Sequence, residues 1–260
     1  MKKTWIRLKQ SLSGSCNDAM IQRSSRLFTL LFPPACILCR QTIIDAAFAG
    51  DAELCAGCYQ KQPLNRICCK RCALPLAYDT DEAALCGRCI RQLPEYHYAR
   101  SLFLYEGDIV ALIHQLKFSE KISYARSIGE MLSPLLDADD LPDCFLPVPL
   151  HVSRLRQRGF NQSIEITRVL ASKTAIPIEI DAVERQRRTA PQTDLDARQR
   201  QKNVRGVFRV SSQVLLYKHV LIIDDVMTTG ATVNELARVL KKHGVERVGV
   251  LCIARAPVRA

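Results

Sequence analysis

The chain has 260 residues, of which 48% are hydrophobic, and a formal net charge of +11. This length accommodates one large domain, or a medium domain with a small one, and the apolar content allows a real core. No apolar run approaches the ~20 residues that span a bilayer, which argues against a membrane-spanning helix. The basic charge makes nucleic acid, acidic lipid and phosphorylated small molecules the classes of partner to consider.

Residues 1–32 are basic and have no clear hydrophobic periodicity. Lys2, Lys3, Arg7 and Lys9 supply the first positive charges. The apolar patch at residues 27–32 is too short for the hydrophobic region of a signal peptide, and no small-residue cleavage site follows it. We therefore expect a basic N-terminal extension on a cytoplasmic protein.

The chain has twelve cysteines, most of them in the first third, where they follow an ordered spacing. A reducing compartment opposes disulfides, so this number indicates metal binding. Four C-x-x-C pairs stand in series: Cys36 and Cys39, Cys55 and Cys58, Cys69 and Cys72, and Cys86 and Cys89. Each pair can place two thiolates on one knuckle, and two knuckles complete a tetrahedral site for Zn2+. The sequence predicts two structural zinc ions.

Pairing the knuckles in sequence order assigns the first four of these cysteines to one zinc and the last four to the other; a crossed pairing stays open. Cys68 competes with Cys69 for one position, and Cys69 is preferred because it keeps the two-residue spacing. Residues 33–94 hold too few large apolar side chains for an independent core, whereas a structural zinc contributes on the order of 10 kcal/mol to folding. We expect a double zinc-ribbon domain there, in preference to a redox or catalytic site.

Residues 95–260 have the pattern of an α/β domain. Strands are predicted at residues 100–105 and 144–148, with helical apolar stripes at residues 109–117 and 125–135. A basic loop with His151, Arg154, Arg156 and Arg158 follows the second strand and precedes a helix. Guanidinium groups suit phosphate through their forked donors, although a basic surface loop has the same composition. We expect these side chains at the carboxyl edge of a parallel sheet.

Residues 185–205 are rich in arginine and lack apolar periodicity, which indicates a mobile loop. Arg185, Arg187 and Arg188 stand at its start. Such a loop can close over a ligand and exclude water, and it can also contact DNA. A hairpin is predicted from residues 207–210 and 214–217, and a last strand at residues 248–254.

Residues 220–232, VLIIDDVMTTGAT, predict a strand, a loop and the start of a helix. The continuous apolar run at residues 220–223 suits a parallel sheet that is covered on both faces. Hydroxyl groups, a glycine and a helix N-terminus form a cradle for a monophosphate. Asp224 and Asp225 suit two adjacent sugar hydroxyls, with Mg2+ moderating their charge. The sequence predicts a ribose 5-phosphate unit as the ligand; the alternative is an ordinary Thr-Gly turn.

This stretch closely resembles the phosphoribosyl pyrophosphate (PRPP) motif of the class I phosphoribosyltransferases. The resemblance implies a parallel sheet with helices on both faces, and a catalytic pair, Asp224 and Asp225, that holds the ribose hydroxyls. The implied PRPP-binding stretch continues through Val226, Met227, Thr228, Thr229, Gly230, Ala231 and Thr232. By position in such a fold, His151 and Arg154 approach the pyrophosphate, and the arginine-rich segment 185–205 closes over it.

The whole pattern resembles the ComF family, in which a zinc ribbon is joined to a phosphoribosyltransferase domain. The match rests on the C-x-x-C pairs, on PVPLHVSRLRQRGFNQ at residues 147–162, on QTDLDARQRQKN at residues 192–203 and on the PRPP motif. It implies PRPP with Mg2+ as ligand, single-stranded DNA as a partner in natural transformation, and a competence helicase or motor protein as a further partner. Nucleobase salvage by phosphoribosyl transfer and a PRPP-sensing regulator are the alternatives. The sequence identifies neither an acceptor-binding hood nor a helix-turn-helix.

Overall fold

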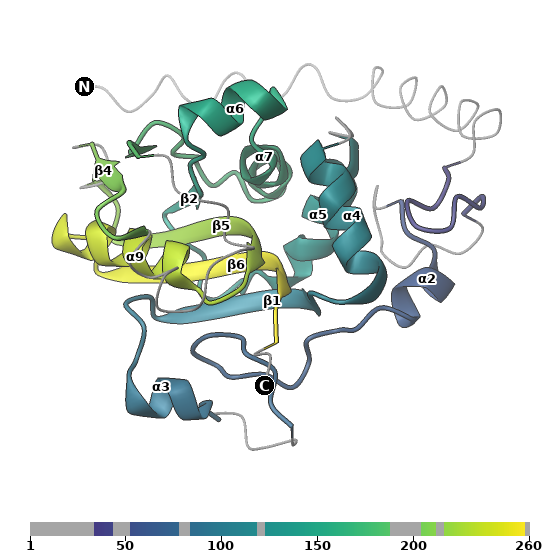
Figure 1. Cartoon of the computed structure of the whole chain (residues 1–260), viewed down its shortest axis with the longest axis horizontal. Helices are drawn as coiled ribbons and strands as arrows, with labels where there is room; N and C mark the ends of the chain where they lie inside the picture. The colour runs from purple at the N-terminus through teal and green to yellow at the C-terminus, as the bar shows by residue number, and fades with distance from the viewer. Residues whose placement is uncertain are drawn as a thin grey trace, which may run out of the picture.

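The computed structural model describes residues 34–43, 53–77, 84–118, 123–187, 204–211 and 216–257 (Figure 1). The predicted basic extension at residues 1–32, Arg188 and most of the predicted mobile loop lie outside the described residues. Within the described ranges, no helix is both long enough and apolar enough to cross a membrane.

A parallel sheet of four strands forms the centre of the molecule. Its order is β1 (Tyr98–Leu104), β6 (Arg247–Arg255), β5 (His219–Met227) and β2 (Cys144–Pro147). β5 and β6 are buried along almost their whole length, as their continuous apolar sequences predict. The carboxyl ends of the strands share one edge, so the segments that follow β2 and β5 are neighbours.

Helices cover both faces of this sheet (Figure 1). One face carries α4 (Gly107–Phe118), α5 (Ser123–Leu132) and α7 (Gln162–Thr174), and the other carries α9 (Ala231–Lys242). Leu221 and Ile223 of β5 share a core with the first three helices, whereas Val220 and Ile222 share a core with α9. This alternation is the period of a strand. The predicted α/β fold with helices on both faces is confirmed.

The cysteine-rich region divides between these two cores. The segment around α2 (Ala56–Gln60) packs beside α4 and α5, and the segment around α3 (Gly87–Arg91) packs into the core of α9 (Figure 1). An antiparallel bridge between Leu64 and Phe103 attaches the middle of the region to β1. The region therefore completes the two cores of the sheet instead of building one of its own.

Two local predictions are refined. The predicted hairpin joins residues 207–210 to residues 214–217, part of which lies outside the described residues; its first strand, β4 (Phe208–Val210), pairs antiparallel with β3 (Val183–Arg185), a pairing that the sequence does not predict. Apolar residues from both strands enter the core of α9, and this burial stabilises their pairing. The helix predicted at residues 125–135 is present as α5, and at Pro134 the chain continues as a 3-10 turn, η1 (Ser133–Leu135), since proline cannot donate to the helix.

Candidate functional sites

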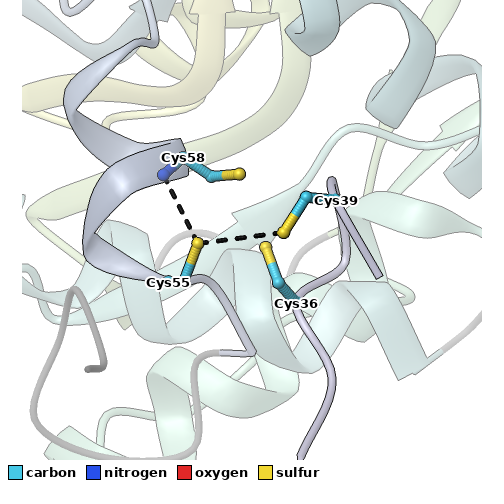
Figure 2. Close-up of side chains that lie close together, drawn as sticks. All are labelled: Cys36, Cys39, Cys55 and Cys58. Carbon is cyan, nitrogen blue, oxygen red and sulfur yellow. Dashed lines mark hydrogen bonds between the residues drawn. The ribbon is translucent and has the colours of Figure 1, made fainter. Parts of the chain in front are cut away.

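The first thiol cluster lies at the start of α2. Cys55 is the N-cap of this helix and accepts the N–H of Cys58 over 3.4 Å, while Cys36 and Cys39 come from the preceding turn. All four Sγ atoms lie within 4.8 Å of one another and gather around one centre (Figure 2). The Sγ atoms of Cys39 and Cys55 are 3.9 Å apart. Cys39 is exposed and Cys55 and Cys58 are half-buried, so this cluster lies at the surface.

The second thiol cluster lies at the start of α3 and is fully buried. It consists of Cys69, Cys72, Cys86 and Cys89, whose Sγ atoms again lie within 4.8 Å of one another. The Sγ atoms of Cys72 and Cys86 are 3.6 Å apart. Cys68 stays outside the cluster. Both clusters therefore follow the sequence-order grouping.

The geometry of both clusters fits Zn2+. A tetrahedral site with Zn–S bonds of ~2.3 Å has sulfur–sulfur edges of about 3.8 Å, close to the separations in both clusters. All cysteines of the described residues are free thiols. Burial opposes ionisation of Cys36 and Cys69, yet backbone N–H donors lower the pKa of each to about 7. Burial and the neighbouring thiols raise the pKa of Cys58 and Cys89, a conflict that a divalent cation removes.

The acidic pair of the predicted motif lies within β5 and not in a loop. Pairing with β6 continues to the end of the strand, where Met227 lies beside Arg255. Asp225 is only 5% exposed, whereas Asp224 remains partly accessible. The two carboxylates therefore have different surroundings, which the sequence does not predict.

Asp225 is held by the protein itself. Its Oδ2 accepts from Lys117 Nζ at 2.9 Å and from Gln162 Nε2 at 2.7 Å, and its Oδ1 accepts from the Val226 N–H at 2.6 Å. Burial works against ionisation, but Lys117 and these hydrogen bonds keep the pKa of Asp225 below its usual range. No sequence prediction gave Lys117 or Gln162 a role at the site. Only the tertiary fold brings the end of α4 and the start of α7 to β5.

Asp224 is the more accessible carboxylate of the pair. Burial and the negative charge of Asp225 raise its pKa to about 7, against the opposing effects of Lys117 and Arg185. One of its oxygens accepts the N–H of Asp225 at 2.9 Å. Asp224 therefore changes charge near neutral pH, and a cationic or hydroxyl-bearing ligand favours its ionised form.

The bend after β5, which we call the phosphate loop (residues 228–232), leads into α9. Gly230 is the N-cap of this helix at a φ of 77°, a left-handed conformation that favours glycine. The N-cap glycine has no side chain to cap the helix, so the positive end of the helix dipole is directed at the bend. The Thr229 hydroxyl accepts from the Ala231 N–H at 3.3 Å. Thr228 and Thr232 complete the hydroxyl set that the sequence predicts.

The predicted basic loop after β2 is a helix, α6 (Val152–Arg158). His151 is its N-cap, and its Nδ1 accepts the Ser153 N–H at 3.2 Å, a local capping bond that makes the helix possible. Arg154 and Arg158 are four residues apart and share one side of the helix. Arg158 donates to Gln162 Oε1 at 3.0 Å, which joins α6 to Asp225 through Gln162.

Arg185 corrects the prediction of a mobile loop at its own position. It ends β3, is 7% exposed, and lies with its guanidinium carbon 5.8 Å from the centre of the Phe208 ring. Burial and the positive charge of Arg154 lower its pKa to about 10, while Asp224 acts in the opposite sense. Arg187 donates to the carbonyl of Arg205 at 3.1 Å. Arg185 therefore belongs to the fixed part of the site.

The carboxyl edge of the sheet thus combines acceptors for hydroxyl groups with donors for anions. Asp224 supplies the acceptor on β5, and the phosphate loop supplies hydroxyls and helix N–H groups. Arg154 and Arg185 add positive charge, and the pKa of Arg185 responds to both Arg154 and Asp224. A ligand with a sugar and more than one phosphate group matches this set of charges.

Comparisons with known proteins agree with both halves of the chain. The double zinc ribbon domain family matches residues 27–95, and the phosphoribosyl transferase domain family matches residues 161–260. The DNA utilization protein YhgH of Escherichia coli K12 is 34% identical over 232 residues, which cover 87% of this chain and 99% of that protein. Competence protein F of Haemophilus influenzae is 33% identical over 229 residues, which cover 85% and 96%. Competence protein ComFC of Streptococcus pneumoniae is 25% identical over 232 residues, which cover 85% and 99%.

The fold and the cysteine clusters define a phosphoribosyltransferase-domain protein with a double zinc ribbon. Its relatives are named for competence and for DNA utilization. The chain belongs to the ComF family of competence-associated proteins, as the sequence motifs predict.

Proposed function

We propose that the protein binds PRPP with Mg2+ at the carboxyl edge of the sheet and uses this ligand in the handling of single-stranded DNA. In this proposal the phosphate loop holds the 5-phosphate through hydroxyl and N–H donors. Asp224 accepts from the ribose hydroxyls, and Asp225 acts chiefly as the anchor of the pair. Arg154 and Arg185 hold the pyrophosphate.

The observation that carries PRPP binding is the position of the partly accessible Asp224 on the strand that leads, through the hydroxyl-bearing phosphate loop, to the N-terminus of α9. Carboxylates repel phosphate, so their presence beside a phosphate cradle requires a ligand that also offers hydroxyl groups. The family match at residues 161–260 supports the same ligand class. Transfer of the phosphoribosyl group to an acceptor, with pyrophosphate leaving, is the second candidate activity. It rests on the phosphoribosyl transferase domain alone.

Titration of the zinc-loaded protein with PRPP and Mg2+ by calorimetry tests the ligand. We expect saturable heat for one site, an affinity at least ~10-fold lower in Asp224→Asn, and wild-type affinity in Asp139→Asn, which changes an exposed carboxylate. Affinity should rise from pH 6 to pH 8, because the acceptor form of Asp224 is the ionised one and its pKa is about 7. PRPP itself titrates in this range, so only the part of the rise lost in Asp224→Asn belongs to the protein. Absence of heat under all these conditions would refute PRPP binding.

The DNA-handling part rests on the relatives and on the charge of the chain. Proteins named for competence and DNA utilization match most of the sequence, and the formal net charge is +11. Lys70, Arg88 and Arg91 are exposed around the second thiol cluster. Basic side chains near a zinc knuckle provide contacts to a phosphate backbone without reading its sequence.

Anisotropy of a labelled oligothymidine tests this part. We expect the affinity to fall steeply between 50 and 200 mM salt, with a log–log slope of ~0.7 for each phosphate contact. Arg88→Glu with Arg91→Glu should lower the slope, whereas Lys242→Glu at the exposed end of α9 should not. Affinity near background at low salt would exclude direct DNA binding. Repeating the titration with PRPP and Mg2+ shows whether the two ligands influence each other.

A further inference from the structure

Arg255 is a buried cation that the proposed ligand site does not use. It ends β6 and is 2% exposed. Its Nε donates to the carbonyl of Cys72 at 3.0 Å, and its Nη1 donates to the carbonyls of Met227 at 2.8 Å and of Thr228. A guanidinium group is planar and rigid, and it is buried only where its donors are satisfied. One group therefore joins a knuckle of the second thiol cluster to the first residue of the phosphate loop.

Two further contacts connect the same parts of the molecule. The Tyr96 hydroxyl lies 3.4 Å from the position of a Cβ atom at Gly230, and Tyr96 shares a core with Cys72 and Cys89. The Glu95 N–H donates at 2.7 Å to Oδ1 of Asn234, which lies in the first turn of α9. The segment that follows the second thiol cluster therefore contacts both the phosphate loop and α9.

The first thiol cluster is attached elsewhere. Glu53, which lies between the two knuckles of this cluster, donates its N–H to Ser127 Oγ of α5 at 3.2 Å. Cys36 lies in the core of α4 and α5, on the opposite face of the sheet from α9. The two clusters therefore provide an internal comparison, since only the second is joined to the phosphate loop by Arg255.

We propose that Arg255 is a positioning residue that couples metal binding at the second thiol cluster to ligand binding at the phosphate loop. A knuckle closed around Zn2+ holds the Cys72 carbonyl in place. This carbonyl orients the Arg255 guanidinium, which in turn holds the Thr228 carbonyl. The N–H groups that follow Thr228 are then held in the direction that a phosphate requires. Linkage is reciprocal, so a ligand that orders the loop must hold zinc in the second cluster more tightly by the same factor. The coupling to PRPP rests on the proposed function.

Transfer of zinc to a coloured chelator, with and without PRPP and Mg2+, measures this coupling. We expect PRPP to slow the loss of one zinc at least ~5-fold and to leave the other unchanged. The unaffected ion controls for zinc binding by PRPP itself. Cys39→Ser, which removes a ligand of the first cluster, should retain the protected ion. In Arg255→Lys, whose single ammonium cannot span the knuckle and the loop, the factor should fall to about one. Equal protection of both ions, or full protection in Arg255→Lys, would overturn the proposal.

Hydrogen exchange without ligand separates this proposal from PRPP binding. Peptides that cover residues 228–234 should exchange ~10-fold faster in zinc-loaded Arg255→Lys than in the zinc-loaded wild type, whereas peptides of α6 should not change. If this holds while PRPP fails to bind, the proposed ligand is wrong and the structural coupling stands. If the loop exchanges at the same rate in zinc-loaded Arg255→Lys as in the zinc-loaded wild type, the coupling is wrong whether or not PRPP binds.

Discussion

Cys89→Ser is expected to prevent stable folding, whereas Cys39→Ser should leave a folded protein that has lost one zinc. Cys89 is 4% exposed and shares the core of α9 with β5 and β6. Loss of a structural zinc removes on the order of 10 kcal/mol, which matches the whole ~5–15 kcal/mol stability of an ordinary domain. Cys39 is exposed, and its cluster lies at the surface beside α2.

Zinc content per chain and thermal unfolding by circular dichroism distinguish the two variants. Cys39→Ser should keep a cooperative transition at a lower Tm. Cys89→Ser should be insoluble or lack a cooperative transition. Cys68→Ser is the matched control, because this thiol lies next to the second cluster but outside it and should leave the zinc content unchanged. A Cys89→Ser protein with one zinc and the wild-type Tm would show that the second site does not stabilise the fold.

The features that the sequence predicts correctly are those with a short-range signal. The spacing of the C-x-x-C pairs predicts the two thiol clusters, since each knuckle is a local turn. The apolar run before Asp224 predicts β5, and the periodicity after Gly230 predicts α9. The order of these motifs also identifies the family before any coordinates are considered.

The features that the sequence does not predict depend on contacts between distant segments. Lys117 reads only as the polar end of an amphipathic helix, and Arg255 as the residue after a buried strand. Their partners, Asp225 and Cys72, become visible only when α4 and β6 are placed in the fold. For Arg185 the sequence signal is wrong. The arginine-rich sequence indicates a loop, but Arg185 pairs with Phe208 and is the last residue of β3.

Lys117→Met is expected to destabilise the protein and to weaken PRPP binding. The Lys117 and Asp225 side chains are 21% and 7% exposed, so this substitution leaves a mostly buried carboxylate without its cation. Breaking a buried pair in this way costs about 3–5 kcal/mol, or about 6–20 °C in Tm for a domain of this size. Without Lys117, the repulsion between Asp225 and Asp224 also increases, which disfavours the ionised form of the ligand-accepting carboxylate.

The pair Lys173 and Glu130 supplies a matched control for this prediction. Its nitrogen and oxygen are 2.6 Å apart, and Glu130 is mostly buried at 9% exposure, but the pair joins α7 to α5 away from the phosphate loop. Lys173→Met should lower the Tm and leave the PRPP affinity unchanged. Lys117→Met should lower both, with the affinity measured below the new Tm by calorimetry.

The double variant Lys117→Met with Asp225→Asn separates charge from shape. An asparagine at position 225 carries no charge and can still accept from Gln162, so most of the stability lost in Lys117→Met should return. PRPP affinity should not return to the wild-type value, since the ion pair between Lys117 and Asp225, which holds the end of β5 in position, is absent. Tighter PRPP binding in Lys117→Met alone would contradict this prediction. Lys117 would then compete with the ligand for Asp225 instead of holding Asp225 in position.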